Sequence, residues 1–149
     1  MENFLSLMLA PLNHWGILIF GMFVFFVLGW FWYNPIGYIG RKWMELNHLE
    51  KPKPEDMPKP HEFVVMLIMQ LFMGFSVTWI VMILWLLVAI TLTPLFATLF
   101  VVKIYMGFVF IKDLGHWYFE QKPFTLVLIG IGYWLVGILA LCGFLTFFL

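Results

Sequence analysis

The longest stretch of the chain without a charged residue or a histidine covers residues 63–102 and reads FVVMLIMQLFMGFSVTWIVMILWLLVAITLTPLFATLFVV. A helix that crosses a bilayer needs about 20 apolar residues, so this stretch is too long for a single crossing. Its best candidate for a turn is at residues 91–94, where Pro94 suits the first position of a new helix. The stretch therefore predicts two transmembrane helices joined by a short turn.

Charged residues are almost as sparse in two other parts of the chain. Between Glu2 and Arg41, His14 is the only charged residue or histidine, and no charged residue follows Lys122. Both parts are continuously apolar rather than alternating, which excludes the strands of a membrane β-barrel. We therefore expect an all-α, polytopic membrane protein, a single domain of residues 1–149 with four transmembrane helices. The expected crossings cover about residues 15–33, 63–90, 95–118 and 124–147.

Composition excludes several other classes of protein. Hydrophobic residues make up 64% of the chain and charged residues 11%, against about 25% charged residues in soluble domains. Eight basic and eight acidic residues balance, which leaves no basic excess for a nucleic acid. Cys142 is the only cysteine, and no histidine spacing matches a pair of metal ligands. We expect no nucleic acid partner, no cofactor and no metal ion.

The basic residues predict how the chain is oriented. Two connections hold nearly all of them: Arg41, Lys42, Lys51, Lys53 and Lys59 in the first, Lys112 and Lys122 near the third. Cytoplasmic loops are enriched in Lys and Arg. We therefore expect a multi-pass protein of a bacterial inner membrane, with a cytoplasmic, Pro-rich connection at residues 47–62 and both termini outside. The residues before the first crossing lack the basic start and the cleavage site of a secretory signal, so we expect them to remain.

The segment after the first crossing carries an aromatic pattern. Trp32 and Tyr33 suit the headgroup level, and Pro35 disfavours helix at the residue before it. Apolar residues then recur at helical spacing, with Arg41 and Lys42 on other faces, which predicts a short helix lying in the interface. The expected interfacial motif comprises Gly29, Trp32, Tyr33, Pro35, Tyr38, Gly40, Arg41, Lys42 and Trp43.

This motif, together with Gly132 and Tyr133 in the last apolar stretch, resembles a family of small integral membrane proteins called domain of unknown function 1761. The resemblance extends from about Phe20 to the end of the chain, and its specific part is the Trp-Tyr-x-Pro segment. Members typically have a histidine after the late Gly-Tyr pair, where this chain has Trp134. The resemblance implies a four-helix membrane protein with no established biochemical activity.

Three polar residues are predicted to reach the middle of the membrane. Lys103 lies nine residues after Pro94, which at 1.5 Å per residue is about 13 Å into the bilayer. The same arithmetic puts Gln70 about 12 Å and Tyr133 about 15 Å from the ends of their helices. Polar groups at this depth usually face the interior of a bundle. We therefore predict a midplane cluster of Lys103, Gln70 and Tyr133.

Three functions fit these residues. The first is a non-enzymatic structural or accessory subunit, in contact with membrane lipids, that packs against copies of itself or against other membrane subunits. The second is a small transporter or channel for an anion or polar solute, which would use the midplane cluster. The third is a lipid-acting membrane enzyme, which would require interfacial groups such as Asp113, His116 and Glu120 to converge. No residue set in the sequence indicates a catalytic site.

Overall fold

The computed structural model describes residues 6, 8–49 and 59–149, and in this part of the chain it contains helices and no strand. Four helices are long and apolar enough to cross a membrane, and a shorter helix follows the first of them. The predicted all-α fold is therefore confirmed. The elements are η1 (Ala10–Asn13), α2 (Trp15–Tyr33), α3 (Tyr38–Leu46), α4 (Pro60–Ala89), α5 (Pro94–Glu120) and α6 (Phe124–Phe148).

The helix ends follow from local chemistry. The Glu62 carboxylate accepts a hydrogen bond from the backbone N–H of Lys59 at 2.9 Å, which allows α4 to begin at Pro60. The hydroxyl of Thr93 accepts from the N–H of Phe96 at 3.4 Å and caps α5 immediately before Pro94. Most of the predicted Pro-rich connection falls on residues 50–58, which lie outside the described part of the chain.

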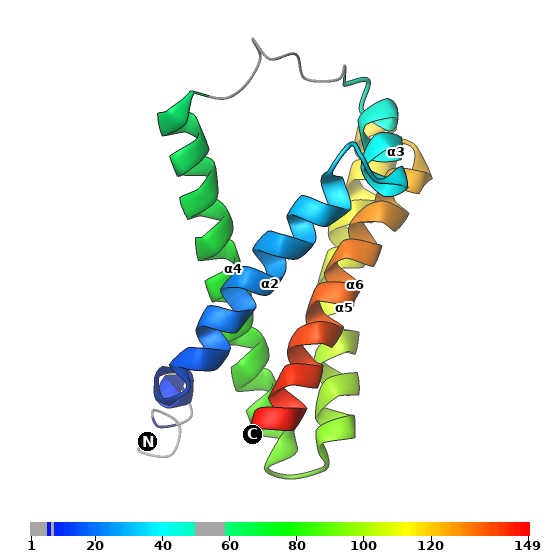
Figure 1. Cartoon of the computed structure of the whole chain (residues 1–149). Coiled ribbons are helices and arrows are strands. Elements are labelled where there is room, and N and C mark those ends of the chain that lie inside the picture. The colour runs from blue at the N-terminus through cyan, green and yellow to red at the C-terminus, as the bar shows by residue number, and fades with distance from the viewer. Residues whose placement is uncertain (1–5, 7, 50–58) are drawn as a thin grey trace.

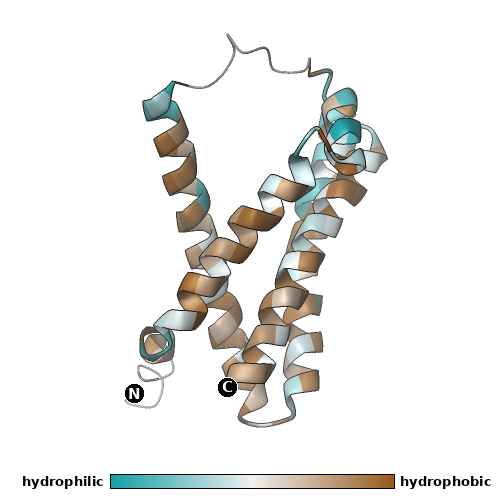
Figure 2. Ribbon diagram, viewed as in Figure 1, coloured by the Kyte–Doolittle hydropathy of each residue, from teal (hydrophilic) through white to brown (hydrophobic). Residues whose placement is uncertain are grey.

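The long helices run between two ends of the molecule that differ in character. Figure 1 shows η1, the α4–α5 turn and the C-terminal end of α6 at one end, and α3 with the α5–α6 connection at the other. Figure 2 shows hydrophobic residues along the long helices and hydrophilic residues gathered around α3 and the ends of its neighbours. We call the end that carries α3 the connected end.

Small residues set the distances between helices. A Cβ on Gly74 of α4 would lie 3.0 Å from the backbone of Met22 in α2, and a Cβ on Gly21 would collide with the side chain of Thr78. The α2 and α4 backbones can therefore cross closely, as small residues allow in membrane helices. Beside this crossing, the buried ring of Phe25 packs against Tyr133 and Trp134 of α6.

The two halves of α4 have different surroundings. From Gly74 onward the helix has a buried face, whereas no residue from Pro60 to Phe72 is buried. Figure 1 shows this first half diverging from the other helices toward the connected end. We call residues 60–72 the free half of α4.

Candidate functional site

The interfacial motif folds the chain back at the end of α2. The Asn34 side-chain oxygen accepts a hydrogen bond from the N–H of Ile36 at 2.9 Å, and the Asn34 carbonyl accepts from the N–H of Gly37 at 3.0 Å. Gly40 lies directly against that same carbonyl, where a Cβ would overlap it. This tight turn points α3 back across the end of the bundle.

Aromatic residues of the motif fasten the turn to α6. The indole N–H of Trp32 donates to the carbonyl oxygen of Ile129 at 3.1 Å, and its ring lies where a Cβ on Gly132 would come within 2.9 Å. The Tyr33 ring packs on Trp43, with centroids 5.2 Å apart. Of the other motif residues, Tyr38 and Arg41 are exposed, and Lys42 is partly exposed and pairs with Glu45.

A polar cavity of about 190 Å³ lies where α3 meets the ends of α5 and α6. We call it the polar cavity. It is lined on the α2–α3 side by Tyr33, Trp43 and Asn47, and on the α5 side by Lys112, Asp113 and His116. These residues come from segments far apart in the sequence, and the motif supplies one wall of the cavity.

Asp113 is the most enclosed charged group of the polar cavity. Its side chain is only 12% exposed, and its carboxylate lies 3.1 Å from the Lys112 ammonium. Across the cavity, Gly130 of α6 leaves room for this carboxylate, because a Cβ there would lie 2.6 Å from Asp113 Oδ2. Burial of a carboxylate is costly unless it is paired, and the ion pair with Lys112 offsets part of that cost.

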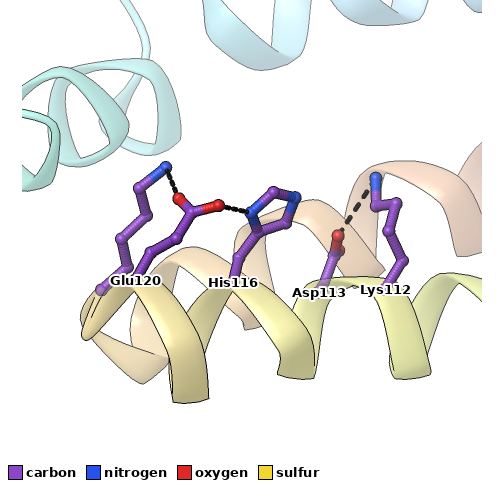
Figure 3. Close-up of polar contacts among 5 residues, drawn as sticks. Lys112, Asp113, His116 and Glu120 are labelled. Atoms are coloured by element: carbon purple, nitrogen blue, oxygen red, sulfur yellow. Dashed lines mark hydrogen bonds and ion pairs between the residues drawn. The ribbon is translucent and has the colours of Figure 1, made fainter.

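A second ionic group follows one turn later on α5. Figure 3 shows the His116 ring and the Glu120 carboxylate pointing toward each other. The other oxygen of Glu120 lies 2.6 Å from the ammonium of Lys122. His116 and Lys122 also line the polar cavity. Asp113, His116 and Glu120, the residues that the lipid-enzyme hypothesis requires, thus lie in one region of α5. The carboxylates of Asp113 and Glu120 are both ion-paired.

The structure brings together two of the three residues of the predicted midplane cluster. The Tyr133 side chain is buried, and its hydroxyl donates to the carbonyl oxygen of Phe25 at 3.0 Å. The Gln70 amide lies 3.4 Å from the same carbonyl oxygen and 3.5 Å from the Tyr133 hydroxyl. These polar atoms therefore satisfy one another inside the bundle.

Lys103 lies apart from this pair, which corrects the prediction that it faces the bundle interior. Ala97 and Val101 are the fully buried positions of this part of α5, and Lys103 is two residues further on, roughly 200° around the helix. Its side chain is exposed, in a shallow surface groove lined by residues of α5 alone. Its stem can run along the apolar surface toward the membrane boundary.

An apolar groove of about 420 Å³ opens between α2, the free half of α4 and α6. We call it the apolar groove. Phe63, Met66 and Met73 of α4 line one side, and the Gln70–Tyr133 pair also lines it. Tyr33 and Trp134 line both this groove and the polar cavity. The two spaces therefore adjoin.

The sequence predicts the interfacial motif, but it does not show that Tyr33 and Trp43 of this motif line a cavity together with Asp113. The available signal was the spacing of Asp113 and His116, which puts them one turn apart on the same helix face. Among the described residues, no group of three or more His, Cys, Asp or Glu side chains could hold a metal ion.

Comparison with known proteins gives one match. No curated protein and no solved structure matches the chain. The sequence model of the family described as "Protein of unknown function (DUF1761)" matches residues 17–146. The match covers α4, α5, the interfacial motif and all but two residues each of α2 and α6, and it agrees with the resemblance carried by the Trp-Tyr-x-Pro segment. The chain is therefore a member of the DUF1761 family, with four helices suited to crossing a membrane.

Proposed function

We propose that this protein is a non-enzymatic accessory subunit that packs, within the membrane, against a second copy of itself or another membrane protein. The observation that carries the proposal is the free half of α4. Most of its apolar side chains are exposed: Phe63, Val64, Val65, Met66, Ile68, Met69 and Phe72.

The physical argument rests on how membrane helices associate. Helix association in lipid depends on close packing and interhelical hydrogen bonds rather than on a hydrophobic driving force. The second half of α4 has a buried face, whereas the free half has no buried residue and, within the described part of the chain, makes interhelical hydrogen bonds only through Gln70. Met66 and Met69 are flexible side chains that adapt to an irregular partner surface. A partner helix would give the free half the contacts that the rest of α4 makes internally.

Photo-crosslinking at two matched positions tests this proposal. A photoreactive amino acid replaces Met69 on the free half, or Phe108 on α5 as the control. The two native side chains are similarly exposed, at 67% and 72%. We expect irradiation of intact membranes to give protein adducts from position 69, at twice the chain mass for self-association, and only lipid adducts from position 108. Lipid adducts alone at both positions would refute the proposal.

The two alternative functions have weaker support. A transport path for an anion would need a charged group at mid-depth, and Lys103 lies on the outer surface of α5. The Gln70 amide and the Tyr133 hydroxyl are engaged with the Phe25 carbonyl rather than directed at a solute. For a lipid-acting enzyme, Asp113 and Glu120 would have to act as acid and base, but each carboxylate is already ion-paired with a lysine.

We further propose that the connected end faces the cytoplasm of a bacterium and that both termini face outward. The enrichment of basic residues in the two connections at this end supports this orientation. Labelling of single cysteines at His48 and Leu92, in a chain whose native cysteine is replaced by alanine, tests it. A membrane-impermeant maleimide added to intact cells should modify position 92 and spare position 48, and the reverse pattern would overturn the orientation.

A further inference from the structure

Two adjoining spaces of opposite character lie side by side at the connected end. The polar cavity contains two lysines, a buried carboxylate and several aromatic rings, and the apolar groove beside it has a mostly hydrophobic lining. Tyr33 and Trp134 belong to both linings. A ligand that fills both must carry a polar group at one end and a hydrocarbon chain at the other.

The levels of the two spaces match those of a membrane lipid. The polar cavity lies beside the last turns of α5 and the amphipathic helix α3, at the level expected for headgroups. The apolar groove follows α4 from Phe63 to Met73, which is about 15 Å of helix. That length is close to half of the roughly 30 Å hydrocarbon thickness, so it suits an acyl chain of one leaflet.

The charges of the polar cavity favour a headgroup that carries both signs. The ammonium groups of Lys112 and Lys122 each have three N–H donors, so each keeps a donor for a phosphate oxygen beside its contact with Asp113 or Glu120. The carboxylate of Asp113 is suited to a primary ammonium, which donates hydrogen bonds to it. The faces of Trp43 and Trp117 in the same lining attract a cation.

We propose that the polar cavity and the apolar groove together form a binding site for a phosphatidylethanolamine-type lipid. The phosphate would lie near Lys112 and Lys122, the ammonium near Asp113, and one acyl chain in the groove. Tyr33 and Trp134 would lie beside the junction between headgroup and chain. The site is built from one copy of the chain, and Met69, the position that tests assembly, does not line the groove.

Native mass spectrometry of the full chain released from detergent tests the proposal. The probes are phosphatidylethanolamine, phosphatidylcholine and phosphatidylglycerol with identical acyl chains, and soluble phosphoethanolamine. We expect preferential retention of phosphatidylethanolamine, since choline cannot donate hydrogen bonds to Asp113 and phosphatidylglycerol lacks the cation. Equal retention of the three lipids would overturn the proposal. Binding of phosphoethanolamine as tight as that of the lipid would remove the groove from the site.

Two variants separate the two parts of the site. Asp113→Asn should weaken phosphatidylethanolamine binding about tenfold through loss of one charge-assisted hydrogen bond. Gly29→Leu should obstruct the groove without straining the backbone, because a Cβ at Gly29 meets its nearest atom, Tyr133 Oη, at 3.5 Å. Lys103→Met is the matched control on the outer surface of α5. If Gly29→Leu retains the lipid as well as the control does, the acyl chain does not occupy the groove.

Discussion

Two glycines at the start of α3, Gly37 and Gly40, should respond differently to the same substitution. A Cβ at Gly40 would overlap the carbonyl oxygen of Asn34 and lie 2.8 Å from the carbonyl carbon of Tyr33. A Cβ at Gly37 would lie 3.5 Å from that same oxygen, an ordinary contact. Because the atoms facing Gly40 are backbone atoms of the preceding turn, no side chain can rotate away to make room.

The expected cost of Gly40→Ala follows from this geometry. Accommodating a methyl group in a filled space costs about 1–3 kcal/mol when the backbone must move. Movement of α3 would also disturb the packing of Trp43 on Tyr33, which places the effect toward the upper end of that range. For Gly37→Ala, alanine lowers the conformational entropy of the unfolded chain, which stabilises the fold, but it is a poorer N-cap for α3 than glycine. These effects oppose each other, so we expect the free energy of unfolding to change by less than about 0.5 kcal/mol.

The assay is unfolding in mixed micelles with increasing dodecyl sulfate, followed by the near-ultraviolet circular dichroism of the packed aromatic rings. The midpoint should fall for Gly40→Ala and stay near that of the unmodified chain for Gly37→Ala. Equal midpoints for the two variants would show that α3 is not held against the Asn34 carbonyl, and the account of the turn would then fail.

Two further substitutions test the interior and the surface of the bundle. Tyr133→Phe should lower the free energy of unfolding by about 0.6 kcal/mol, the average for an interhelical hydrogen bond in a membrane. The loss should be this small because the Gln70 amide can still donate to the Phe25 carbonyl. A loss above about 2 kcal/mol in the same unfolding assay would contradict this. Lys103→Met should leave the unfolding midpoint unchanged, because the side chain is exposed, and a clear drop would place its ammonium among interior partners.

The positions of the membrane helices could be predicted because charge is so unevenly distributed. Charges and prolines interrupt apolar stretches that are otherwise continuous, so Thr93 and Pro94 mark a helix start that the structure confirms. The short helix α3 could also be predicted, because Asn34 and Pro35 end one helix and an amphipathic pattern follows. These signals act locally and need no knowledge of packing.

The rotation of each helix could not be predicted in the same way. The spanning helices are apolar on all faces, so hydrophobic patterning does not distinguish the side that meets other helices from the side that meets lipid. The depth of Lys103 is fixed by its distance from Pro94, but its direction is set by the burial of Ala97 and Val101 on the opposite side of α5. The separation of the free half of α4 from the bundle likewise has no local signal.

The structure gives the residues of the interfacial motif two different roles. Trp32 attaches the turn to α6, and Gly40 allows α3 to lie against the Asn34 carbonyl. Tyr33 and Trp43, by contrast, line the polar cavity. A turn that only reversed the chain would not require aromatic side chains to line a cavity beside a buried carboxylate. The pattern that carries the family resemblance therefore directs attention to the connected end, where Asp113 lies, rather than to the middle of the membrane.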